Sequence, residues 1–203
     1  MRRLLLATNN AGKVHEYKSL LKNVPFELVT PSEVGITTIV DETGETLEEN
    51  ARLKAVALAR VSSLLALADD SGLEVDALGG KPGPMSARFA GEQASDKDRV
   101  NYLLLRLKDI PWEKRTARFR CVIAVAELDG KVEFTSGECR GFIAFEPKGE
   151  LGFGYDPVFF FPDLNKTMAE LPLEIKNKVS HRGQAAKKIV PLLKRLAKEG
   201  ETR

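Results

Sequence analysis

Cysteine is scarce in this chain of 203 residues, which contains only Cys121 and Cys139. No CxxC pair and no arrangement of cysteine with histidine has the spacing of a zinc site. Disulfides persist in oxidising compartments and are rare in the cytoplasm. We therefore expect two reduced thiols in a cytoplasmic protein.

Long hydrophobic runs and an excess of one charge sign are also missing. No stretch approaches the roughly 20 apolar residues that span a bilayer, and the apolar run near the start is too short for a signal peptide. The chain has 31 basic and 29 acidic residues and a net charge of +2. This balance argues against a protein that mainly coats nucleic acid. Without repeats or a low-complexity linker, we expect one domain over residues 1–203, large enough for two lobes.

Hydrophobic periodicity predicts strands linked by helices in the first half of the chain. The expected strands and helices follow one another at residues 3–8, 14–22, 26–31, 46–64, 64–69 and 95–110. Thr46 with Glu49 has the spacing of a capping box, and Ser95 with Asp98 marks another helix start.

Between residues 115 and 147 the apolar period changes to two, and Asp129-Gly130 is a hairpin signal. The tail from residue 168 is mostly helical and basic, and Pro191 should interrupt and kink its last helix. These patterns predict an α/β protein with a mixed sheet. The Pro/Gly-rich segments 79–84 and 147–154 are the expected seams between two lobes, with a ligand cleft between the lobes.

Two adjacent aspartates, Asp69 and Asp70, stand where the strand at 64–69 should end. One interpretation is a strand-to-turn junction with Gly72 as a turn residue. The other is a metal site, because carboxylate oxygens hold hard divalent cations. If the backbone stays extended, the two side chains diverge and only one can face the metal.

A polar loop follows the first predicted strand. Thr8, Asn9 and Asn10 leave the strand and Lys13 opens a helix, so backbone amides and one lysine could bind phosphate. This is not a Walker A loop, and a simple capped turn is the alternative.

An acidic loop precedes the helix predicted at 46–64. Glu42 or Glu45 could supply a second carboxylate to a metal held by Asp69 or Asp70. The alternative is a loop that is merely solvated.

Two further segments carry groups that suit a nucleotide. Ser180, His181 and Arg182 fall at a helix start, either as donors to a carbonyl or phosphate oxygen or as a simple cap. Phe153, in a Gly-rich loop, offers a flat face for a base. Together with the acidic groups, this set predicts a metal-dependent enzyme acting on a nucleotide. Serine-hydrolase chemistry fits poorly, because no G-x-S-x-G motif is present.

Five segments in order resemble the inosine triphosphate pyrophosphatase family: LATNNAGK, ETGETLEENARLKA, ADDSGLEVDALGGKPGPMSARFAG, GFGYDP and SHRGQA. The resemblance implies hydrolysis of ITP, dITP and XTP to the monophosphate and pyrophosphate. It also implies an elongated two-lobed α/β fold with a long mixed sheet flanked by helices. The active site would lie in the cleft between the lobes, and the protein would form a homodimer.

The resemblance also implies roles for individual residues. Asp70 is the implied general base, and Glu42 and Asp70 are the implied ligands of Mg²⁺. The implied substrate-binding residues are Thr8, Asn9, Asn10, Lys13, Ser71, Phe153, Gly154, Tyr155, Asp156, Lys176, His181 and Arg182.

Selectivity should depend on the six-position of the purine, which carries an oxygen in hypoxanthine and xanthine and an amino group in adenine. Arg182, His181 or backbone N–H groups would donate a hydrogen bond to this oxygen. The amino group of adenine would leave the same donors without an acceptor. A pyrophosphatase for other modified nucleotides and a non-catalytic nucleotide sensor are the alternative functions. The pair of Asp70 and Glu42 argues against the sensor, which gains little from a poised base.

Overall fold

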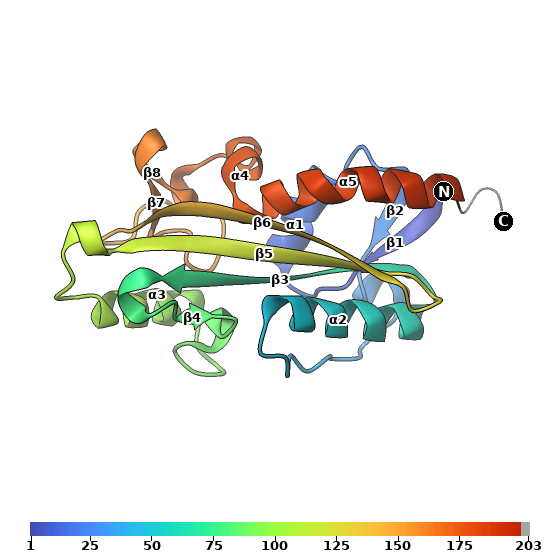
Figure 1. Cartoon of the computed structure of the whole chain (residues 1–203), viewed down its shortest axis with the longest axis horizontal. Helices are drawn as coiled ribbons and strands as arrows, with labels where there is room; N and C mark the ends of the chain where they lie inside the picture. Colours follow the sequence, from blue (N-terminus) through green and yellow to red (C-terminus); the bar gives the residue numbers. More distant parts are fainter. Residues whose placement is uncertain (200–203) are drawn as a thin grey trace. The chain divides into compact units, whose positions relative to one another are not determined.

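The computed structural model describes residues 1–199 and contains one mixed sheet flanked by helices (Figure 1). The strands are β1 (Arg2–Leu6), β2 (Phe26–Val29), β3 (Leu65–Val75), β4 (Pro82–Gly83), β5 (Thr116–Ala126), β6 (Val132–Ile143), β7 (Phe159–Phe161) and β8 (Lys166–Thr167). The helices are α1 (Ala11–Leu20), α2 (Leu47–Ser62), α3 (Asp96–Arg106), α4 (Leu173–Val179) and α5 (His181–Glu199). None of the described helices has the length and apolar character that crossing a membrane requires.

The sheet has the strand order β2-β1-β3-β5-β6-β7-β8, with β4 paired to β3. Strand β1 runs parallel to both β2 and β3, whereas β4, β7 and β8 pair in antiparallel fashion with their neighbours. The predicted α/β class with a mixed sheet is confirmed. The predicted hairpin is also present, because β5 and β6 are joined by a turn in which the Glu127 amide donates to the Lys131 carbonyl.

The chain divides into two compact units. Unit 1 consists of Met1–Asp70, Cys121–Gly137 and the described residues from Arg182 onward, and unit 2 consists of Ser71–Arg120 and Glu138–His181. The boundaries fall inside β3, β5 and β6 and at the start of α5. Both predicted seams, 79–84 and 147–154, lie inside unit 2 instead. Local Gly and Pro content did not locate the boundaries, because extended strands pass from one unit into the other without a linker.

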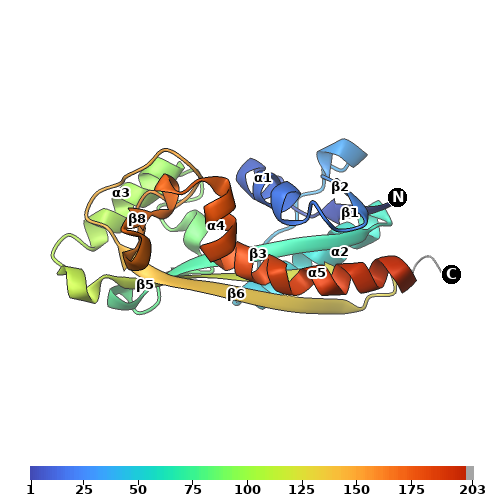
Figure 2. The same cartoon turned by 90° about the horizontal axis from the view of Figure 1, so that it is seen from above.

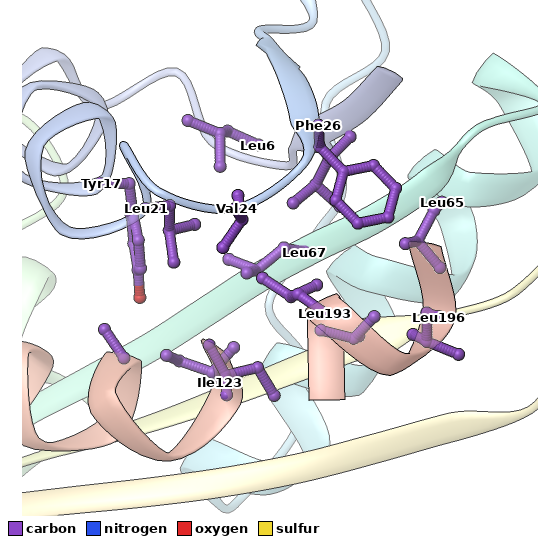
Figure 3. Close-up of a cluster of buried hydrophobic side chains, with 14 of the residues drawn as sticks. Leu6, Tyr17, Leu21, Val24, Phe26, Leu65, Leu67, Ile123, Leu193 and Leu196 are labelled. Carbon is purple, nitrogen blue, oxygen red and sulfur yellow. The ribbon is translucent and has the colours of Figure 1, made fainter. Parts of the chain in front are cut away.

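Unit 1 has a hydrophobic cluster on each face of its part of the sheet. Leu67 of β3 packs with α1 and α5 on one face, and Ala66 packs with α2 on the other. Figure 1 shows α5 and α2 on opposite sides of these strands, and Figure 2 shows the same helices from above. Figure 3 shows the first cluster, in which Tyr17 and Leu193 approach the sheet side chains. Strands covered on both faces require a continuous apolar sequence, which explains the run from residue 64 to residue 68.

The strand β3 does not end at the two aspartates but continues to Val75. The predicted junction is therefore wrong, and Gly72 is not a turn residue. A Cβ atom at Gly72 would lie 2.3 Å from the carbonyl oxygen of Gly83, because β4 packs closely against β3 there. Gly72 thus permits the approach of a second strand. Asp69 and Asp70 occupy extended backbone, as their divergent side chains require.

The helix starts predicted at Thr46 and Ser95 are confirmed, whereas the helix break predicted at Pro191 is wrong. Thr46 with Glu49 and Ser95 with Asp98 form capping boxes at the starts of α2 and α3. Helix α5 runs unbroken through Pro191, which is exposed. The buried face of α5 stabilises the helix against the sheet, which compensates for the hydrogen bond that Pro191 cannot make.

Candidate functional site

The loop between β1 and α1 is ordered by its own polar side chains. Asn10 caps α1, and its Oδ1 accepts from the Lys13 amide at 2.9 Å. The Asn10 amide donates to Thr8 Oγ1 at 3.2 Å, while Asn9 is exposed. The four residues predicted to bind phosphate therefore surround one helix N-terminus, where the helix dipole favours an anion.

Asp69 points into a buried ion-pair network in unit 1. Its Oδ1 lies 2.9 Å from Lys13 Nζ, and its Oδ2 lies 3.0 Å from Arg182 Nη2. Arg182 Nη1 in turn lies 2.7 Å from Oε2 of Glu16. Glu16, Asp69 and Arg182 are each 2% exposed. Two carboxylates thus balance two cations, as buried charges require.

The network keeps Asp69 ionised. Burial opposes the charged form, but Lys13 and Arg182 lower the pKa of Asp69 well below its usual range. Nearby, burial raises the pKa of the Cys121 thiol to about 12, so the thiol stays protonated at 3.7 Å from Asp69 Oδ2. A carboxylate held by two cations is a poor proton acceptor at neutral pH. The environment therefore gives Asp69 a positioning role.

Asp70 has different surroundings. Its Oδ1 accepts from Lys54 Nζ at 2.9 Å, and the same ammonium lies 2.6 Å from Glu42 Oε1 and 2.8 Å from the Asp69 carbonyl oxygen. Burial raises the pKa of Asp70, and this effect exceeds the lowering by Lys54 and Lys13. A raised carboxyl pKa moves the group toward the range in which a general base works best.

Lys54 and Asn50 of α2 are site residues that the sequence interpretation missed. Asn50 Nδ2 is 3.5 Å from Asp70 Oδ2, so both side chains reach the Asp70 carboxylate. Leu47, Ala51 and Leu58 lie on the buried face of α2. Asn50 and Lys54 fall on the same helical stripe, where apolar residues are expected. This polar interruption of an apolar stripe was the signal that could have identified them.

The acidic loop is fixed to α2 through Asn50. The Gly44 amide donates to Asn50 Oδ1 at 2.8 Å, and Asn50 Nδ2 donates back to the Gly44 carbonyl at 3.3 Å. A Cβ atom at Gly44 would lie 2.6 Å from the Cβ atom of Glu49, so only glycine fits. Glu42 is half-buried and pairs with Lys54, whereas Glu45 is exposed. The geometry favours Glu42 as the second carboxylate.

The donor set fits a hard divalent cation. Glu42 and Asp70 both direct an oxygen at one positive centre, the Lys54 ammonium, so their carboxylates converge. Among residues 1–199, no group of three or more His, Cys, Asp or Glu residues is arranged for a metal ion. Mg²⁺ is often bound by one or two carboxylates together with substrate phosphates. The two carboxylates therefore match a cation that shares its ligands with a phosphorylated substrate.

Unit 2 brings together Phe153, Asp156 and Lys176. The Phe153 amide donates to Asp156 Oδ2 at 2.9 Å, and Lys176 forms a buried ion pair with the same carboxylate. Lys176 Nζ lies 4.9 Å from the centre of the Phe153 ring, within cation–π range. The ring therefore lies beside the Lys176 ammonium. The Tyr155 ring is buried, and its hydroxyl donates to the Ser86 carbonyl at 2.9 Å, so Phe153 is the ring that can stack on a base.

The remaining predicted residues lie near the unit boundaries. Ser71 follows Asp70 in β3 and is half-buried. His181 stacks on Phe119, with ring centroids 4.6 Å apart, and its Nδ1 lies 3.9 Å from Cys139 Sγ. Arg182, the next residue, donates to Glu16 and Asp69 in unit 1. These bonds favour a positioning role for Arg182 over direct recognition of the base.

The family model described as "Ham1 family" matches residues 4–192 of the chain. The chain belongs to the Ham1 family. The dITP/XTP pyrophosphatase of Bacillus subtilis is 48% identical over 193 residues, which cover 95% of this chain and 98% of that protein. The dITP/XTP pyrophosphatase of Desulforamulus reducens is 52% identical over 194 residues, which cover 96% of each chain.

The solved structure of a HAM1 protein from Coxiella burnetii has a TM-score of 0.85 and 40% identity. The alignment covers 95% of this chain and 98% of that one. The resemblance to inosine triphosphate pyrophosphatases is therefore confirmed for this Ham1-family chain as a whole. The roles of individual residues remain predictions.

Glu16→Ala should strongly destabilise the protein, because it removes one of two carboxylate partners from the buried Arg182 guanidinium. We expect the free energy of unfolding to fall by roughly 3 kcal/mol, the lower end for a broken buried pair, since Asp69 remains. Denaturant titration measures the change. Glu27→Ala, at an exposed position of β2, is the matched control and should cost less than about 0.5 kcal/mol. Equal losses in both variants would contradict the importance of the network.

Proposed function

We propose that this Ham1-family protein hydrolyses deaminated purine nucleoside triphosphates, namely ITP, dITP and XTP, to the monophosphate and pyrophosphate. The observation that carries the proposal is the Asp70 carboxylate, buried beside Glu42 and Lys54, with a pKa raised by burial. A poised base next to convergent carboxylates suits metal-assisted hydrolysis. The names of the Bacillus and Desulforamulus relatives support the substrate class.

Different residues are proposed for different parts of the nucleotide. Unit 1 offers the triphosphate the amides at the start of α1 and the ammonium of Lys13. Unit 2 offers the base the ring of Phe153, held by Lys176. Phosphate groups attract cations and helix N-termini, whereas a purine gains from stacking on an aromatic face.

Asp70 acts as the general base. Its carboxylate, oriented by Lys54 and Asn50, takes a proton from a water that attacks the α-phosphorus. Pyrophosphate leaves opposite the attacking oxygen, and the nucleoside monophosphate remains. Lys13 and the amides of its loop offset charge on the departing oxygens. Mg²⁺, held by Glu42 and Asp70, would neutralise phosphate charge when bound.

Selectivity comes from hydrogen-bond donors that face the six-position of the purine. A carbonyl oxygen there accepts a hydrogen bond, whereas the amino group of adenine cannot. A buried donor left without an acceptor costs about 1–3 kcal/mol. His181 and backbone N–H groups are the proposed donors, because the guanidinium of Arg182 donates to Glu16 and Asp69.

We also propose a homodimer in the cytoplasm. The dimer follows from the resemblance to the inosine triphosphate pyrophosphatases. A reducing compartment suits the two cysteines, which are buried and free.

A panel of triphosphates tests the reaction. Purified protein with Mg²⁺ should convert ITP and XTP to the monophosphates and pyrophosphate, and ATP at least tenfold more slowly, as expected for a lost hydrogen bond of about 1.4 kcal/mol. Anion-exchange chromatography identifies the products. Release of orthophosphate and a diphosphate would mean attack at the γ-phosphorus and would overturn the proposal.

Asp70→Asn should lower the single-turnover rate of ITP hydrolysis by roughly 10²–10⁴, the usual contribution of a positioned base. Asp69→Asn should lose less activity, and mainly through stability, because Asp69 holds Lys13 and Arg182. Thermal melting controls for folding. If folded Asp69→Asn is inactive while Asp70→Asn stays within a few-fold of wild type, the two roles are reversed.

Glu42→Gln should raise the Mg²⁺ concentration needed for half-maximal activity by roughly tenfold, because a metal ligand loses its charge. Glu45→Gln is the matched control in the same loop and should leave the Mg²⁺ dependence unchanged, since Glu45 is exposed. A Mg²⁺ titration of both variants at fixed ITP gives the comparison. A shift in Glu45→Gln alone would show that the wrong carboxylate was chosen.

A further inference from the structure

Asp96 lies outside every predicted site segment but contacts the loop that carries Phe153. Its Oδ2 accepts a hydrogen bond from the Gly154 amide at 2.7 Å. Asp96 is the first residue of α3, 58 positions away from Gly154 in the sequence. The bond therefore joins two separate segments of unit 2.

The Asp96 carboxylate is held in position by its own helix. Asp96 is the first residue of α3 and directly follows the N-cap Ser95. Arg99, one turn later, forms an ion pair with Oδ1 of Asp96. Arg99 Nη1 also donates to the carbonyls of Ala87 and Ala94, at 2.9 and 2.8 Å. With Oδ1 engaged by Arg99, Oδ2 remains directed at Gly154.

The loop that receives this bond is costly to order. Gly152 and Gly154 have φ angles of +77° and +63°, a left-handed backbone that only glycine adopts readily. Glycine loses more conformational freedom on ordering than any other residue. The Phe153 ring lies between these two glycines, so its position depends on fixing the backbone on both sides. On the Gly152 side, Asp156 accepts from the Phe153 amide, and on the Gly154 side, Asp96 accepts from the Gly154 amide.

We propose that Asp96 is a positioning residue for the nucleobase. By holding the Gly154 amide, it orders the Phe153 loop before a purine arrives, so that less conformational entropy is lost on binding. This inference rests on the proposed function, because it takes the Phe153 ring as the surface on which the purine stacks. Asp96 touches neither the base nor the phosphates; it acts through the loop.

A positioning role predicts a specific kinetic signature. The loop contacts the base equally in the ground state and the transition state. A less ordered loop should therefore weaken the binding of both states alike, which raises KM and leaves kcat unchanged. Asp96→Ala should therefore raise KM for ITP roughly three- to tenfold, the effect of one lost hydrogen bond. The value of kcat should stay within about twofold of wild type. Asp96→Asn keeps an acceptor oxygen and should lie between wild type and Asp96→Ala.

Asp98→Ala is the matched control. It removes another carboxylate from the first turn of α3 and weakens the capping box, but Asp98 bonds to Ser95 and not to the loop. We expect a loss of thermal stability in this variant with an unchanged KM. An equal rise of KM in Asp98→Ala would mean that fraying of α3 causes the effect, and it would overturn the role of Asp96. An unchanged KM in folded Asp96→Ala would overturn it as well.

Binding of IMP, measured by calorimetry without turnover, separates this inference from the proposed function. Asp96→Ala should weaken IMP binding by the same three- to tenfold factor, and Asp98→Ala should not. If wild-type protein hydrolyses no triphosphate but IMP binding follows this pattern, the proposed reaction fails and the positioning role stands. If ITP is hydrolysed but Asp96→Ala binds IMP as wild type does, the positioning role fails and the reaction stands.

Discussion

The extended backbone of β3 separates two neighbouring carboxylates, and unit 1 is organised around that separation. Successive side chains of a strand point to opposite faces, so Asp69 enters the buried network of Lys13 and Arg182 while Asp70 meets Lys54. The same peptide also supplies the Asp69 carbonyl to Lys54. A shift of one residue along the strand would turn every side chain to the opposite face.

The two environments give chemically equal side chains opposite properties. Asp69 is held by two cations that lower its pKa, whereas the pKa of Asp70 is raised because burial outweighs the charge of Lys54. Asp69 thereby stabilises the buried ion-pair network, and Asp70 is available for proton transfer. Burial favours the neutral form of both, and the number and closeness of the cations decide the difference.

Features that depend on neighbouring residues could be predicted from the sequence. Features that depend on contacts between distant segments could not. The capping boxes at Thr46 and Ser95 depend on residues three positions apart, which the sequence displays directly. The sequence suggests a turn residue at Gly72. Glycine is required there instead because Gly83 of another strand approaches closely. The loops of the site could be predicted through a family resemblance. Lys54 lies inside a helix that the sequence predicts from its apolar periodicity, whereas its partners Glu42 and Asp70 come from other segments.

Each unit contains one buried thiol, Cys121 in unit 1 and Cys139 in unit 2. Burial raises the pKa of both to about 12, so neither is a thiolate nucleophile in the folded protein. An alkylating reagent can reach either sulfur only after the surrounding core opens. The two cysteines are therefore native reporters of local unfolding, one for each unit, and their labelling rates would separate the opening of the carboxylate-bearing unit from that of the unit that carries Phe153.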